Sequence, residues 1–171
     1  MAYPPIQIVD ENDKPIGSAN MYEAWEKGQW HRIVRIMVQA DDGSLLLQLR
    51  SHNMEIYPNH WDHSAAGHVD ENESWETSAK RELAEEAGIT GVKLDEIKYY
   101  KTNDSFKGYQ LKRFNKVYLV KLYKNITLKK QDEEVSELRW FSLDEVKDML
   151  NIEPEKMTPG LRKVLINCSF V

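Results

Sequence analysis

Three glutamates in the middle of the chain have a spacing that would place them on one side of a helix. Glu82, Glu85 and Glu86 stand at positions i, i+3 and i+4, and a helix turns by about 100° per residue, so the three carboxylates share one face. Like charges this close repel one another, and a hard divalent cation, which prefers oxygen ligands, would relieve the repulsion. Taken alone, such a cluster is more typical of a solvated helix face.

The sequence around the glutamates favours a metal site instead. Their pattern runs from residue 67 to residue 89 and reads Gly67-x5-Glu73-x7-Arg81-Glu82-Leu83-x-Glu85-Glu86-x-Gly88-Ile89. It resembles the Nudix box, the signature of the Nudix hydrolase superfamily, with no position missing. Nine specified positions with two fixed spacers make this a highly specific signal.

The resemblance implies an enzyme that hydrolyses a diphosphate linked to another group, X, with Mg²⁺ or Mn²⁺ as the cofactor. It implies that Glu85 and Glu86 are metal ligands, and that Glu82 is a ligand or the base that prepares the attacking water. The carbonyl oxygen of Gly67 is expected to complete the metal site.

Arg81 has two expected roles. The resemblance places it in the catalytic set together with Glu82 and Glu85. It also implies that Arg81 and Glu73 form a structural pair, which holds the loop before the helix onto the helix itself.

Further residues are candidates for contacts with the substrate or the metal. Arg50, at the end of a predicted strand, can pair with two phosphate oxygens at once, although a surface ion pair explains it equally well. His68 is a candidate substrate contact, and a hydrogen-bonded histidine lining the cleft is the simpler interpretation. Many Nudix enzymes use a distal glutamate as a ligand or base; Glu133 and Glu134 are the candidates here, and we favour Glu133.

The likeness extends beyond the box to nearly the whole chain. Residues 9–13, 30–32, 46–50, 61–68 and 132–145 resemble the isopentenyl-diphosphate-isomerase-like branch of the Nudix proteins. That branch contains true isomerases as well as hydrolases, so the resemblance leaves both activities open.

The residues expected at the isomerase positions favour a hydrolase. The isomerases carry a catalytic cysteine just before the box glycine, where this chain has Ala66, which cannot transfer a proton. Two strand glutamates of the isomerases match Phe114 and Lys116, although His31 and His68 match two isomerase metal ligands. We therefore expect a Nudix hydrolase, with isopentenyl-diphosphate isomerase, and then a non-catalytic nucleotide-sensing module, as the alternatives.

The elements expected around the box indicate an α+β fold. Patterning predicts helices and strands without the regular alternation of a doubly wound sheet. The expected helices cover residues 19–27, 74–87, 142–150 and 159–167, and the expected strands cover residues 31–39, 44–49, 97–100, 116–123 and 137–141. We predict a Nudix-type α/β/α sandwich with a mixed β-sheet. Residues 1–171 would form a single Nudix domain, with residues 1–30 as an N-terminal extension packed on it.

Composition limits the partners and the compartment. The 171 residues include 28 acidic and 23 basic side chains, for a net charge of −5, which argues against nucleic acid as a partner. Cys168 is the one cysteine, so internal disulfides and zinc sites of several cysteines are excluded. No apolar run is long enough for a bilayer, and we expect the first five residues, which lack a basic start and an apolar stretch, not to be a secretory signal. We expect a cytoplasmic protein without membrane contact that binds a small-molecule diphosphate; a homodimer is allowed but not required.

Overall fold

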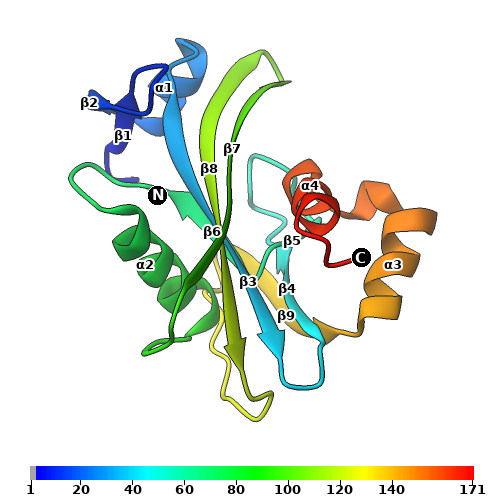
Figure 1. Ribbon diagram of the computed structural model, residues 1–171. Helices are drawn as coiled ribbons and strands as arrows, with labels where there is room; N and C mark the ends of the chain where they lie inside the picture. The colour runs from blue at the N-terminus through cyan, green and yellow to red at the C-terminus, as the bar shows by residue number, and fades with distance from the viewer. Residues whose placement is uncertain (1–2) are drawn as a thin grey trace.

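The computed structural model describes residues 3–171, which form one mixed nine-stranded sheet with helices on both sides (Figure 1). The strands are β1 Ile6–Val9, β2 Pro15–Ala19, β3 His31–Ala40, β4 Leu45–Arg50, β5 Trp61–Asp62, β6 Ala65–His68, β7 Asp95–Phe106, β8 Tyr109–Leu122 and β9 Val135–Phe141. The helices are α1 Met21–Glu26, α2 Trp75–Ala87, α3 Leu143–Ile152 and α4 Pro159–Asn167, with a 3-10 turn at Pro154–Lys156.

Strand β3 is the centre of the sheet. It pairs antiparallel with β1, β4 and β6, and it pairs parallel with β8 over ten residues from His31 to Ala40. Strand β7 forms a long antiparallel hairpin with β8, and β9 adds to β4. The expected mixed sheet is therefore confirmed, and β6, which carries Gly67, lies directly beside the central strand.

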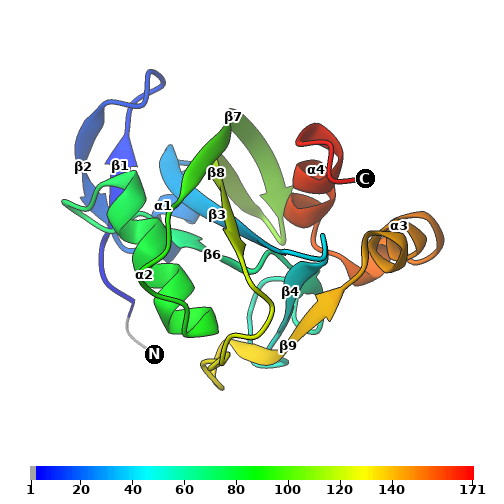
Figure 2. The ribbon, with the colours of Figure 1, turned by 60° about the horizontal axis from the view of Figure 1, so that its bottom comes forward.

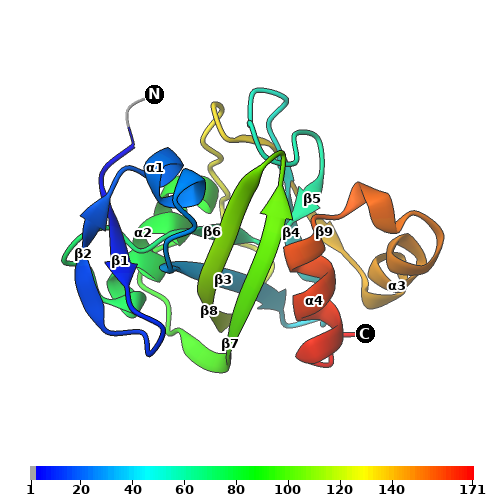
Figure 3. The ribbon, with the colours of Figure 1, turned by 90° about the horizontal axis from the view of Figure 1, so that it is seen from above.

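The alternation of side chains along β3 builds two separate cores. Val34 and Ile36 point to one face and pack with Leu83 of α2, whereas Met37 points to the other face and packs with Leu161 of α4. Figures 2 and 3 show α2 on one side of the sheet and α3 and α4 on the other. This is the α/β/α sandwich that the sequence predicted.

Helix α2 has the boundaries that its capping residues dictate. The side chain of Ser74 accepts a hydrogen bond from the Thr77 amide at the N-terminal end. Gly88 ends the helix with φ of 71°, a left-handed conformation that glycine adopts without a Cβ penalty. The helix that carries the three glutamates is therefore confirmed almost to the residue.

The expectations about strands need two kinds of correction. Strands β7 and β8 continue well beyond residues 97–100 and 116–123 and meet at a tight turn of Lys107 and Gly108. Residues 101–106 alternate between exposed and half-buried positions, and residues 109–115 mix polar and apolar side chains, so neither stretch has the apolar run of a typical core strand. Strands β1, β2, β5 and β6 were missed because they are short, and Ala19, expected to begin a helix, instead ends β2.

The N-terminal segment joins the same sheet. Strand β1 pairs with β3 through Ile8 and His31, and the Gln7 amide donates to the Val69 carbonyl at 2.9 Å. The division into a domain of 1–171 with an extension of 1–30 stays a prediction. None of the helices in residues 3–171 is both long and apolar enough to cross a membrane.

Candidate active site

The three glutamates of α2 differ sharply in burial. Glu82 and Glu86 are buried, with 8% and 3% of their surface exposed, whereas the Glu85 side chain is 51% exposed. Glu82 points at β6: a Cβ placed on Gly67 would lie 2.0 Å from Glu82 Oε1. The missing side chain at residue 67 therefore makes the room in which the Glu82 carboxylate sits.

Glu86 is fixed by two hydrogen bonds. Its Oε2 accepts from the backbone amide of Ala66 and from Gln48 Nε2, both at 2.9 Å. Both donors come from strands, β6 and β4, so the carboxylate is locked between the helix and the sheet. A buried carboxylate with only neutral donors is a suitable ligand for a cation.

Burial changes the protonation of both carboxylates. Loss of water raises the pKa of Glu82 to about 7, although Arg81 opposes this rise. Burial, and then the charge of Glu82, raises the pKa of Glu86 well above its ordinary value. Two neighbouring buried carboxyl groups with raised pKa values would be stabilised in their charged form by a cation bound between them.

Arg81 connects the box. Its Nη1 lies 2.8 Å from Glu82 Oε1 and 3.4 Å from Glu85 Oε2, so one guanidinium bridges both carboxylates. On its other side Arg81 Nη2 bonds to Glu73 Oε2 and to the His68 carbonyl, both at 3.0 Å. The expected pairing of Glu73 and Arg81 is present and ties the loop after β6 to α2.

The two candidates for the distal glutamate differ in burial. Glu133, the one we favoured, is exposed, while Glu134 is half-buried. The charge of Glu134 contributes to the raised pKa values of both Glu82 and Glu86, and its own pKa is raised by burial and by the charge of Glu85. Glu134 is therefore the residue that the fold brings toward the acidic cluster.

The donor set suits a hard cation but is not a closed cage. Within residues 3–171 no three carboxylate, histidine or cysteine side chains converge tightly enough to hold a metal ion by themselves. Glu82 and Glu86 form the buried part of the cluster, and Glu85 is held aside by Arg81. Two acidic oxygen donors beside a glycine that leaves room for them fit Mg²⁺ or Mn²⁺, both of which keep part of their water shell.

Arg50 lies at the end of β4 and is partly committed to structure. Its Nη1 lies 3.2 Å from Asp62 Oδ2, and its Nε donates to the carbonyls of Ile56 and Tyr57. Its charge also lowers the pKa of Glu86 in part. Arg50 therefore organises the loop before β5 at a position close to the acidic cluster.

His68 forms a pair with His31. Their rings stack with centroids 5.4 Å apart, and the Nε2 atom of each ring is buried without a hydrogen-bond partner among residues 3–171. Burial and the charge of Arg113 lower the pKa of His31 to about 3, so this histidine stays neutral. Neither ring lines the cavity at the β3–β4 turn or the cavity at the β7–β8 hairpin.

The β8 residues on the face of this histidine pair are Arg113 and Asn115, not the aligned Phe114 and Lys116. Arg113 pairs with His31 in the β3–β8 register, and Asn115 follows on the same face of β8. Phe114 instead contacts Trp30 and Lys116 lies over the Trp75 ring, on the opposite face. Since neither pair of residues contains a carboxylate, the case against isomerase chemistry is unchanged.

Sequence patterns did not indicate Gln48, which lies in an apolar strand, where a single polar residue is usually explained by solvent exposure. Gln48 is buried and reaches Glu86 through long-range strand pairing. Arg35 was missed for the same reason: it is buried opposite Ala66 in the β3–β6 register, and its side chain lines a separate cavity with Gly160 of α4.

Comparison with known proteins agrees with this geometry. The NUDIX domain model matches residues 29–167. The isopentenyl-diphosphate Delta-isomerase of Nocardia farcinica is 31% identical over 94% of this chain and 92% of its own. Nudix hydrolase 3 of Arabidopsis thaliana is 34% identical over 80% of this chain, which corresponds to 19% of the plant protein.

The fold has solved counterparts. A protein of Deinococcus radiodurans with a known crystal structure superposes with a TM-score of 0.78 over 96% of this chain and 98% of its own, at 20% identity, a level that shows the shared fold alone. The family model, in contrast, covers most of the chain, including the whole box from Gly67 to Ile89. The chain is thus a member of the Nudix hydrolase family, whose enzymes act on small-molecule diphosphates with divalent metal ions.

Proposed function

We propose that this protein hydrolyses the diphosphate linkage of a nucleoside diphosphate derivative, or of a related compound, with Mg²⁺ or Mn²⁺. The observation that carries the proposal is the pair of buried carboxylates, Glu82 and Glu86, held beside Gly67. Burying two acidic groups is costly unless a cation compensates them. The diphosphate of the substrate would be drawn to the same cation.

Each residue of the box has a role that follows from its surroundings. A bound metal ion supplies charge neutralisation of the diphosphate and activation of a water molecule. Glu86, locked by Ala66 and Gln48, would be a fixed ligand of the ion, and the exposed Glu85, 3.4 Å from Arg81, would be a further ligand. Glu82, buried beside Gly67, would be the second fixed ligand of the ion.

The test is a hydrolysis screen with Mg²⁺ over sugar nucleotides, dinucleotides, oxidised nucleotides, coenzyme A and prenyl diphosphates. Release of a monophosphate product from at least one compound is expected, and Glu85→Gln should lower kcat on it by about tenfold or more. Glu76→Gln is the matched control, because Glu76 is an exposed residue of the same helix whose one ion pair within residues 3–171 is with Lys80. A Glu85→Gln variant with full activity would refute the role of Glu85.

Isopentenyl-diphosphate isomerase activity is the second candidate, and similarity over nearly the full length of the Nocardia farcinica enzyme favours it. The histidine pair His31 and His68 lies beside Ala66 and Arg113, which supply neither a thiol nor a carboxylate for moving a proton at carbon. Incubation with isopentenyl diphosphate and Mg²⁺ should therefore yield no dimethylallyl diphosphate. Clear formation of that product would exclude our assignment.

A nucleotide sensor without catalysis is the weaker alternative function, and tight nucleotide binding without any turnover would support it.

We also propose that the protein is located in the cytoplasm. A homodimer is compatible with the family, and light scattering of the purified protein tests it.

A further inference from the structure

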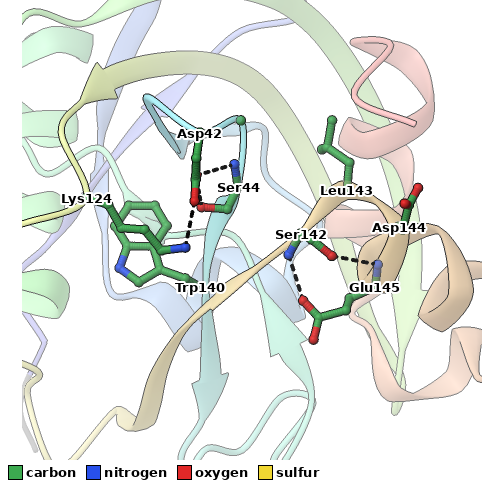
Figure 4. A pocket seen from close by; sticks show the side chains of 9 residues that line it. Asp42, Ser44, Lys124, Trp140, Ser142, Leu143, Asp144 and Glu145 are labelled. Carbon is green, nitrogen blue, oxygen red and sulfur yellow. Dashed lines mark hydrogen bonds and ion pairs between the residues drawn. The ribbon is translucent and has the colours of Figure 1, made fainter.

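Two hollows of this molecule differ in how far their charges are already paired. The larger one, of about 300 Å³, lies at the β3–β4 turn beside the start of α3 (Figure 4). In it Asp42 bonds to Ser44 and to Lys124, and Glu145 closes a capping box with Ser142. A ligand would have to break these bonds in order to bind.

The second hollow, which we call the arginine cavity, has an excess of positive charge. It has a volume of about 190 Å³ and lies between the β7–β8 hairpin, β3 and the beginning of α4, which runs alongside the hairpin (Figure 3). Its charged lining consists of Arg35, Arg113, Lys163 and Asp104. Since Lys163 pairs with Asp104 at 3.1 Å, the two arginines remain as net positive charge.

Neither arginine forms a direct ion pair among residues 3–171, although the charges of Asp62 and Asp104 act on Arg35 and Arg113, respectively, from farther away. Arg35 is only 8% exposed, and its Nε donates to the neutral Asn115 Oδ1 at 3.0 Å. The Nε of Arg113 is buried and makes no hydrogen bond. Burial and the nearby charge of Arg35 lower the pKa of Arg113 to about 10. Two guanidinium groups facing one cavity are costly unless an anion joins them.

The start of α4 adds to the same field. Pro159 and Gly160, in its first turn, line the cavity, and a helix N-terminus carries positive partial charge. A Cβ on Gly160 would lie 2.5 Å from Arg35 Nη1. The glycine therefore leaves the space that the Arg35 guanidinium occupies.

The arginine cavity and the acidic cluster lie on two sides of the same short strand. Arg35 lies opposite Ala66 in the β3–β6 register, and the Ala66 amide bonds to Glu86. Tyr57 lines the cavity, and its carbonyl accepts a hydrogen bond from Arg50, next to the cluster. Within residues 3–171 β6 pairs with β3 alone, so an elongated molecule that passes over its other edge would meet metal ligands at one end and the two arginines at the other.

We propose that the arginine cavity binds a phosphate group carried by X, in addition to the diphosphate that is cut. This inference rests on the proposed hydrolase function and narrows its substrate to diphosphates with a further phosphate. Guanidinium groups pair with phosphate oxygens two at a time, and a cavity of about six water volumes accommodates a phosphate. An isoprenyl chain in the same place would leave both guanidinium groups without partners.

Binding of inorganic phosphate to the metal-free protein, followed by calorimetry, tests the cavity without any turnover. Arg113→Met should weaken binding about ten- to hundredfold, the range expected for a lost charge-assisted contact. Lys112→Met is the control. Lys112 directly precedes Arg113 in β8 and lies over the Trp30 ring, so this substitution removes one positive charge outside the cavity. Arg113→Met removes an unpaired charge, so its melting temperature should stay equal or rise.

Equal phosphate binding by wild type and Arg113→Met, or no binding by either, overturns the cavity proposal. Kinetics with matched substrates then tests its place in the reaction. Coenzyme A against dephospho-coenzyme A, and NADP against NAD, differ by one phosphate each. A KM about tenfold lower for a phosphorylated member, lost in Arg113→Met, supports the proposal, and equal KM values within both pairs contradict it. Phosphate binding without hydrolysis of any compound would overturn the proposed function and leave the cavity intact.

Discussion

At the scale of single residues, the site depends on two carboxylates that the fold has removed from water. Glu82 and Glu86 have raised pKa values because of burial, whereas Glu85, in the same turn, is exposed. Three neighbours of identical type therefore have different environments, and their substitutions should have different effects.

Glu86→Gln should abolish most metal-dependent activity. The substitution keeps the shape, and its amide oxygen can still accept from Ala66, but the negative charge that holds the cation is lost. We expect kcat/KM to fall by about a hundredfold, as for loss of a metal ligand or its partner. Steady-state kinetics at several Mg²⁺ concentrations measures this, and undiminished activity at limiting Mg²⁺ would contradict it.

Gly67→Ala should reduce the activity strongly while changing the stability little. The new Cβ would lie 2.0 Å from Glu82 Oε1, so the carboxylate must move. Because the displaced atoms are the end of a flexible side chain, we expect a small change in melting temperature together with a large loss of kcat. If the loss of kcat were small, the position of Glu82 would not matter for catalysis.

At the scale of elements, Arg81 fixes the loop after β6 to α2. Bonds to Glu73, to the His68 carbonyl and to Glu82 make it the connection between the strand with Gly67 and the helix with the ligands. Burial opposes the charge of Glu73, but hydrogen bonds from Arg81 and Ser78 hold its pKa below the ordinary value.

Glu73→Gln should lower the free energy of unfolding at pH 7 by about 1 kcal/mol, a figure reduced for partial exposure of the pair. A carboxyl with a lowered folded pKa stabilises above its unfolded pKa and loses that effect as the pH falls through the folded value. The difference from wild type should therefore vanish in acid. Urea unfolding at pH 7 and pH 3.5 measures it; a difference that is independent of pH would indicate a packing effect.

Whether a feature of this protein can be predicted from the sequence depends on how far apart in the chain the interacting residues are. Helix α2 and its acidic cluster were predictable because the capping residues and the three glutamates are all close together in the sequence. The partners of Glu86 were not, since Gln48 is 38 positions away in the chain and reaches it only through strand pairing. The same holds for Arg113, whose burial follows from the parallel register of β3 and β8.

At the scale of the whole molecule, the sandwich encloses basic groups that stay neutral. His31 lies in the central strand with no exposed surface, and burial followed by the charge of Arg113 lowers its pKa to about 3. The unfolded chain would bind a proton at this histidine below pH 6.5, while the folded protein would not. Folding stability is therefore lost as the pH falls from 6.5 toward 3.

His31→Gln should flatten this acid sensitivity. Between pH 7.5 and pH 5, the free energy of unfolding of wild type should fall by about 2 kcal/mol relative to the variant, because one proton uptake is removed. Urea denaturation of both proteins without metal measures the two slopes. Parallel slopes would show that His31 is protonated in the folded state.

A divalent cation held by Glu82 and Glu86 is the centre of the proposed site, and anomalous diffraction from crystals soaked in Mn²⁺ tests its presence most directly. We predict an anomalous peak within about 2.5 Å of oxygens from both carboxylates, which is a coordination distance for a hard cation. The peak should be absent from Glu86→Gln crystals soaked in the same way. Carboxylates without a peak in wild-type crystals, or a peak that persists in the variant, would contradict the assignment.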